Sequence, residues 1–163
     1  MHPTLPQHFH PLSRVWIYQS DRIFSDIETQ EIKTLIQDFV GTWKSHGANV
    51  KGFADIYFNM FIVFMADESS VQVGGCSTDS SVRIIKSIEQ QYVVNMFDRT
   101  RLTFTMNGQM KQFALDNIES EISNNTISAE SLYFNNIIST KQEFENNWII
   151  PLKNSWLSKF ISA

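Results

Sequence analysis

The sequence predicts a single-domain α+β protein in which helices pack on an antiparallel or mixed sheet. Its 163 residues fit one domain and leave little room for two. Hydrophobic residues make up 42% of the chain, which is enough to fill a core. Segments of strand composition alternate with segments of helical apolar spacing, without a linker or repeat between them. We therefore expect one α+β domain over residues 14–163, preceded by an irregular, proline-rich lead-in over residues 1–13.

The first strand and the first helix are predicted from composition and capping. Residues 15–19 are β-branched and aromatic, which favours a strand. Ser25 and Glu28 have the spacing of a capping box and predict a helix start. Apolar residues follow on one helical face: Ile32, Leu35, Ile36, Phe39 and Trp43. Gly47 is the expected stop, which places His46 in the last turn, at the negative end of the helix dipole.

Two strands and a second helix are expected next. Residues 52–58 and 61–66 predict two strands joined through Asn59, which tolerates the left-handed backbone of a tight turn. The second strand is apolar on both faces, as in the centre of a sheet. A short strand is expected at 71–73, and a helix near Ser80. The apolar stripe of that helix consists of Val82, Ile85, Ile88 and Tyr92.

The second half begins with a predicted hairpin at Asn107-Gly108, between strands at 101–106 and 109–113. The remaining predictions are a short helix at 116–123, a strand at 132–138, a helix capped by Thr140 and Glu143 that buries Phe144 and Trp148, and, from Pro151, a closing helix with Trp156 and Phe160. Over residues 14–106 the order strand–helix–strand–strand–helix–strand matches a split βαβ, ferredoxin-like core.

Composition excludes several classes of function. The net charge is -4 and no cluster of Lys and Arg is present, so we expect no nucleic-acid partner. The longest apolar run, residues 61–66, is too short to span a bilayer. The N-terminus lacks the basic start and apolar run of a secretory signal, and the lone Cys76 cannot form an internal disulfide. We therefore expect a cytoplasmic protein without membrane insertion.

The segment Gly74–Ser81 is the strongest candidate site. Two glycines followed by small hydroxyl residues and a helix start can direct backbone N–H groups at a phosphate or carboxylate. The candidate ligand-binding residues are Gly75, Ser77, Ser80 and Arg83. Asp79 opposes an anion there, and the same residue types serve as ordinary helix caps. Capping is the simpler interpretation, and the anion site is the alternative.

Cys76 is the candidate nucleophile, because a helix start stabilises a thiolate. A cysteine-phosphatase cradle needs an arginine six residues later, where Val82 stands instead, and no spacing singles out one of the four histidines as a base. Gly47 and Gly52 have the separation of a P-loop, but the lysine that should follow is absent. His8 and His10 have no acidic or cysteine partner nearby in sequence. We therefore expect no cofactor and no metal site.

A resemblance is carried by residues from about Arg14 to the end of the chain. They are Trp16-Ile17-Tyr18-Gln19, Trp43 with His46-Gly47, Phe61-Ile62-Val63, Gly75-Cys76-Ser77 with Asp79-Ser80-Ser81, Phe97-Asp98-Arg99, Phe134-Asn135-Asn136, and Pro151-Leu152-Lys153-Asn154-Ser155-Trp156. Together they resemble a family of small uncharacterised proteins from Bacteroidetes-type bacteria, often labelled "ABC transporter ATPase". The sequence does not support that label, since the Walker lysine and the ABC signature loop are missing. The resemblance implies a bacterial cytoplasmic protein and supplies no mechanism.

Two functional hypotheses follow. The favoured one is a non-enzymatic binding or interaction module, because no complete catalytic set of residues is present. The alternative is a small-anion-binding protein, or a cysteine- or serine-dependent enzyme, that uses Gly74–Ser81 with Cys76 or Ser77 at its centre and Arg83 as charge partner. The expected ligand is accordingly a protein or a small anion, and the sequence leaves the oligomeric state open.

Overall fold

The computed structural model describes residues 2–161, which form an α+β protein of four α-helices and three antiparallel sheets. Their contacts divide them into two compact units. The first, called the N-terminal unit, contains residues 5–98 and 139–142. The second, called the C-terminal unit, contains residues 2–4, 99–138 and 143–161. The α+β class predicted from sequence is confirmed.

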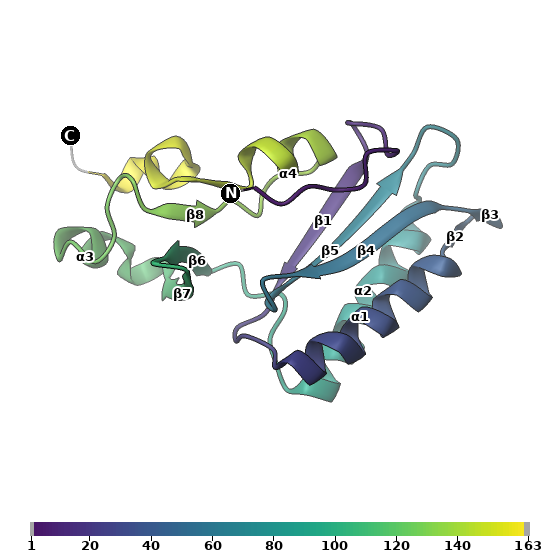
Figure 1. Ribbon diagram of the computed structural model, residues 1–163, viewed down its shortest axis with the longest axis horizontal. Helices are drawn as coiled ribbons and strands as arrows, with labels where there is room; N and C mark the ends of the chain where they lie inside the picture. Colours follow the sequence, from purple (N-terminus) through teal and green to yellow (C-terminus); the bar gives the residue numbers. More distant parts are fainter. Residues whose placement is uncertain (1, 162–163) are drawn as a thin grey trace. The chain divides into compact units, whose positions relative to one another are not determined.

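The sheet of the N-terminal unit has the order β1-β5-β4, with both pairs antiparallel (Figure 1). Its strands are β1 (Arg14–Gln19), β5 (Phe61–Asp67) and β4 (Lys51–Tyr57). Every residue of β5 is buried, as the apolar run over residues 61–66 predicts for a central strand. The predicted split βαβ arrangement is present, because β5 lies between β1 and β4 and is antiparallel to both. The fourth strand of a ferredoxin-like sheet is not in place, since β6 (Arg101–Met106) belongs to another sheet.

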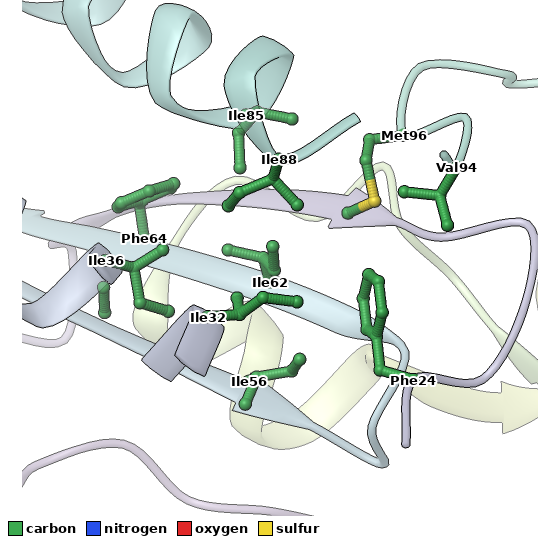
Figure 2. Close-up of a cluster of buried hydrophobic side chains, with 11 residues drawn as sticks. Phe24, Ile32, Ile36, Ile56, Ile62, Phe64, Ile85, Ile88, Val94 and Met96 are labelled. Atoms are coloured by element: carbon green, nitrogen blue, oxygen red, sulfur yellow. The ribbon is translucent and has the colours of Figure 1, made fainter. Parts of the chain in front are cut away.

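Helices α1 (Asp26–Gly41) and α2 (Gly75–Tyr92) cover one face of this sheet (Figure 1). Ile32 and Ile36 of α1 and Ile85 and Ile88 of α2 have no exposed surface, and Figure 2 shows them around Ile62 and Phe64 of the central strand. Burying one such side chain contributes about 1.5–3 kcal/mol. The core cluster consists of Phe24, Ile32, Ile36, Ala54, Ile56, Ile62, Phe64, Ile85, Ile88, Val94 and Met96.

The start of α1 is the predicted capping box. The Ser25 hydroxyl accepts from the Glu28 N–H, and the Glu28 carboxylate accepts from the Ser25 N–H. The predicted end is wrong, because α1 ends at Gly41. A short hairpin of β2 (Lys44–Ser45) and β3 (Ala48–Asn49) follows. His46 and Gly47 form its turn, at φ 52° and 82°, so neither belongs to a helix. An asparagine or glycine usually occupies the first of these left-handed positions, so the histidine found there gives no sequence signal for the turn.

The lead-in before β1 is irregular, and two of its apolar side chains are buried. Leu5 is 3% exposed and Phe9 is 5% exposed. The Phe9 ring meets the Phe53 ring of β4 edge-on at 6.4 Å, and Lys51 Nζ donates to the His8 carbonyl. The His10 N–H donates to the Asp67 carboxylate at the end of β5. These contacts attach the lead-in to the sheet.

The C-terminal unit contains a four-stranded antiparallel sheet of order β7-β6-β8-β9. The strands other than β6 are β7 (Gln109–Ala114), β8 (Leu132–Phe134) and β9 (Ile149–Pro151). The predicted hairpin is confirmed, with Asn107 and Gly108 at φ 53° and 78°. The helices are the 3₁₀ helix η1 (Leu115–Asn117), α3 (Ile118–Ser123), α4 (Lys141–Asn147), and the 3₁₀ helices η2 (Leu152–Asn154) and η3 (Trp156–Phe160).

Three local predictions in the remaining segments are wrong. The strand expected at 132–138 ends at Phe134, and residues 71–73 form no strand. Pro151 ends β9 and precedes 3₁₀ turns instead of opening an α-helix. Since Pro lacks an N–H and can end an edge strand as readily as it starts a helix, its position alone does not separate the two.

Candidate functional site

Helix α2 begins at Gly75, five residues before the predicted start. Its N-cap is Gly74, with φ −80° and ψ 177°, and no side chain caps it. The hydroxyl groups expected to be caps bind carbonyl oxygens instead. Thr78 Oγ1 donates to the Gly74 carbonyl at 3.2 Å, and Ser81 Oγ donates to the Thr78 carbonyl at 2.6 Å. Serine and threonine satisfied in this way are compatible with a helix interior, which explains the earlier start.

Ser77 joins α2 to the β2–β3 hairpin. Its hydroxyl donates to the Lys44 carbonyl at 2.6 Å, and its own carbonyl accepts from Trp43 Nε1 at 3.0 Å. The Ser45 hydroxyl accepts from the Gly74 N–H at 3.2 Å. Ser77 is 5% exposed and its hydroxyl already has a partner. It therefore has a structural role and is not presented to a ligand.

The other candidate ligand-binding residues lie on the solvent side of the helix. Gly75 and Arg83 are exposed. Ser80 Oγ donates to the Cys76 carbonyl at 3.0 Å and accepts from Arg83 Nη2 at 3.0 Å. At about 100° per residue, Gly75 and Ser77 lie on nearly opposite sides of α2. The structure therefore does not bring the four predicted residues to one site.

Cys76 is exposed in the first turn of α2, and the fold brings His46 next to Gly74, which precedes this turn. A Cβ built on Gly74 would lie 3.1 Å from His46 Nε2. Sequence spacing could not select His46, because the hairpin turn that carries it was not predicted. Within residues 2–161, no hydrogen bond joins the Cys76 thiol to the imidazole, so the activating contact of a cysteine–histidine pair is not made.

An exposed apolar cluster lies at the opposite end of α2. It consists of Ile23, Ile27, Val93 and Phe97, and these side chains are 51%, 75%, 86% and 40% exposed. Ile23 and Ile27 stand at the start of α1, while Val93 and Phe97 follow the end of α2, which is the same end of the N-terminal unit (Figure 1). We call these four residues the exposed apolar cluster.

Hydrogen bonds connect the segments that carry the cluster. The Arg22 guanidinium donates to the Tyr92 carbonyl at 2.7 Å, which joins the start of α1 to the end of α2. The Asp21 N–H donates to the Asn95 carbonyl at 3.1 Å, and the Asp21 carboxylate accepts from the Asn95 N–H at 3.1 Å. The Phe97 N–H donates to the Asn95 side chain at 2.9 Å. The four apolar side chains therefore stand on one framework.

Sequence reasoning missed this cluster because its members fall in two segments, about seventy residues apart, that only the fold brings together. One signal was present: Ile27 lies outside the apolar stripe of α1, on the face that should be polar. Val93 adjoins the buried Val94, so composition alone does not mark it as an exposed position.

Two ionisable groups on the segments that carry the cluster have shifted pKa values, Glu28 and Tyr92. Arg22 binds the Glu28 carboxylate through two N–H···O contacts of 2.8 Å, which, with the Ser25 N–H, lower the pKa of Glu28 to about 2. Burial, and then the hydrogen bond from its hydroxyl to Glu31, raise the pKa of Tyr92 to about 12. Arg22 is therefore a neutralised cation, and Tyr92 is an uncharged donor.

Residues 2–161 contain no group of three His, Cys, Asp or Glu side chains arranged to hold a metal ion. In the same part of the chain, no helix has the length and apolar character needed to cross a bilayer. Comparison with protein-family models, with curated proteins and with solved structures finds no match to this chain. Functional inference therefore rests on the residues themselves.

Proposed function

We propose that the chain is a non-enzymatic interaction module of the bacterial cytoplasm, and that it docks its partner on the exposed apolar cluster. The observation that carries the proposal is the exposure of Val93, which is 86% accessible in a left-handed backbone conformation with φ 54° and ψ 59°. A β-branched residue costs about 1–2 kcal/mol there, where glycine costs little. Val93 keeps this backbone strain although its apolar side chain is exposed to solvent, which points to a role other than stabilising the fold.

The grouping of the cluster supports the same conclusion. Single exposed apolar residues are normal on a protein surface, whereas apolar side chains gathered at one place mark interaction sites. Ile27 is 75% exposed in the first turn of α1, where a polar residue would serve the helix equally well. Ile27 and Val93 therefore expose apolar area on a shared framework without contributing to the core.

The cellular context is also part of the proposal. The exposed thiol of Cys76, the lone cysteine of the sequence, is compatible with a reducing compartment. The net charge of -4 disfavours a nucleic-acid partner. The resemblance to a family from Bacteroidetes-type bacteria supports a bacterial source.

The test is affinity capture from a native lysate with four forms of the protein. We expect the wild type and Cys76→Ser to recover the same partner, and the double variant Ile27→Ser/Val93→Gly to lose it. Leu12→Ser removes another exposed apolar side chain, which is 65% accessible in the N-terminal unit, and should retain the partner. Thermal unfolding of each variant confirms that it is folded. Capture that survives the double variant but fails with Cys76→Ser would move the interaction to the start of α2 and refute the proposal.

A further inference from the structure

The carboxylates near the exposed apolar cluster exceed the cations. Four of them form no ion pair within residues 2–161: Asp21, Asp26, Glu31 and Glu89. Each is fixed by a hydrogen bond to a neighbouring segment. Asp21 accepts from the Asn95 N–H, Asp26 from Asn59 Nδ2, Glu31 from the Tyr92 hydroxyl and Glu89 from the Met96 N–H. These hydrogen bonds fix the four carboxylates on the segments that carry the apolar side chains, or next to them in sequence.

The cation of this surface does not offset that charge. Arg22 lies against Glu28, with the guanidinium donating to both carboxylate oxygens, so the pair contributes no net charge. The start of α1 adds a partial positive charge of about one half, and the end of α2 adds an opposite one of similar size. The last turn of α2 contains no basic residue. The exposed Arg99 follows Phe97 by two residues in the chain and offsets one of the four carboxylates, so the remaining charge of these segments is negative.

We infer that the partner docked on the exposed apolar cluster is a polypeptide segment whose apolar side chains are flanked by lysine or arginine. This inference rests on the proposed function and specifies the partner's chemistry. Apolar contact removes the exposed surface of Ile27 and Val93 from water, while basic side chains meet the four unpaired carboxylates. Charge complementarity of this kind accelerates association and excludes acidic competitors.

A second copy of this chain is a poorer occupant. In a symmetric dimer the same surface meets itself, so each carboxylate of the cluster would face those of the partner copy. Like charges brought together in this way oppose association. Arg22 cannot relieve that repulsion without giving up its contacts with Glu28.

The experiment uses the full chain and three fluorescent synthetic peptides. All three share one amphipathic pattern of leucines, and their polar positions are lysine, glutamate or serine. Binding is measured by fluorescence anisotropy, and the contact surface is mapped by amide chemical shifts. We expect the lysine peptide to bind with shifts at Ile23, Ile27 and Val93, and its affinity to fall as salt is raised, because screening weakens exposed charge interactions. The glutamate peptide should not bind.

Two matched pairs of variants separate charge from apolar contact. Asp26→Asn/Glu31→Gln should weaken the lysine peptide about fivefold, while Asp38→Asn/Asp79→Asn, with the same net charge, should leave it unchanged. Asp38 and Asp79 are exposed and lie about 17–21 Å along α1 and α2 from the cluster, beyond the screening length at physiological salt. Val93→Gly should weaken all binding at the cluster, and Leu12→Ser should not.

The outcomes distinguish the partner's chemistry from the docking site. Equal binding of the lysine and serine peptides at the cluster overturns the charge inference and leaves the proposed function standing. Chemical-shift changes confined to residues outside the cluster overturn both the charge inference and the proposed function. A dimer in analytical ultracentrifugation that Ile27→Ser/Val93→Gly disperses identifies the second copy as occupant and overturns the inference of a basic partner. Four results for the lysine peptide together support the inference of a basic partner. They are chemical-shift changes at the cluster, salt-dependent affinity, weaker binding to Asp26→Asn/Glu31→Gln and unchanged binding to Asp38→Asn/Asp79→Asn.

Discussion

At the scale of single residues, Val93 keeps two methyl groups exposed in a backbone conformation that lowers stability. It ends α2 in the left-handed conformation, and its N–H donates to the Glu89 carbonyl. We expect Val93→Gly to raise the free energy of unfolding by about 1 kcal/mol, because glycine adopts this conformation without a Cβ penalty. Urea unfolding measures the change. A loss of stability would mean that the Val93 side chain makes contacts within the fold that outweigh its backbone strain.

Steric contact, and not backbone conformation, requires a glycine at position 52 in β4. A Cβ at this position would lie 2.9 Å from Trp43 Cε3 and 3.1 Å from Val40 Cγ1. Trp43 cannot easily withdraw, because it is 3% exposed and its indole N–H donates to the Ser77 carbonyl. We therefore expect Gly52→Ala to destabilise the protein by about 1–3 kcal/mol, measured by thermal unfolding.

The control for that change is Gly75→Ala. Its Cβ would meet nothing within 4 Å, and the residue stands in the first turn of α2, where alanine is the better helix former. Its stability should match or slightly exceed that of the wild type. Equal losses in both variants would show that the contact with Trp43 is not the cause.

At the scale of elements, the start of α1 links stability to pH. Arg22 and the Ser25 N–H hold the pKa of Glu28 at about 2, below its ordinary 4.5. A carboxylate with a lowered pKa stabilises the fold above pH 4.5 and loses that contribution as the pH falls towards 2. Glu28→Gln should therefore be less stable than the wild type at pH 7, and the difference should shrink across this interval.

Chemical unfolding at several pH values checks this prediction. Asp38→Asn, in the C-terminal half of α1, is the control for removing one negative charge from the same helix. If the difference in unfolding free energy between Glu28→Gln and the wild type stays constant down to pH 2, Glu28 is not the cause of the acid dependence.

Elements with a complete local signal could be predicted from the sequence. The capping box fixed the start of α1, and the Asn107-Gly108 dipeptide fixed the β6–β7 hairpin. The apolar run over residues 61–66 was placed correctly at the centre of its sheet. The order β1-β5-β4 follows the predicted split βαβ arrangement, whereas the place of β6 in another sheet could not be predicted, since it depends on contacts between residues far apart in sequence.

The candidate site was harder to predict than the fold. Ser77 and Ser80 have the composition of caps, yet their hydroxyls bind Lys44 and Cys76 carbonyls inside a longer helix. The β2–β3 hairpin that receives Ser77 has no conventional turn residue before Gly47. The exposed apolar cluster combines residues from both ends of the N-terminal unit's sequence, so no local sequence pattern predicts it.

At the scale of the whole molecule, the chain passes between the two units four times, after residues 4, 98, 138 and 142. Residues 139–142 belong to the N-terminal unit, where backbone hydrogen bonds hold them: Val15 N–H to the Ser139 carbonyl, Lys141 N–H to the Ser13 carbonyl and Gln142 N–H to the Pro11 carbonyl. Because neither unit is a continuous stretch of the chain, unfolding of one unit frees the ends of segments that belong to the other. We therefore expect the units to unfold together.

Phe104→Ala tests this coupling. Phe104 has no exposed surface and lies in the core of the C-terminal unit, with Leu102, Tyr133 and Leu152. Its truncation should cost about 3–5 kcal/mol. If unfolding is shared, hydrogen exchange will accelerate in peptides from both units by a similar factor. Acceleration confined to residues 99–138 would show that the units open independently.

The exposed thiol at the start of α2 also gives the molecule a ready attachment point for a spectroscopic label. Cys76 is the lone cysteine in the sequence, so a maleimide dye reacts at one position without any engineered change. From Cys76 to Val93 the helix spans about 25 Å, well within the range of resonance energy transfer. A dye placed there stands clear of the docking surface while remaining close enough to report the arrival of a labelled peptide.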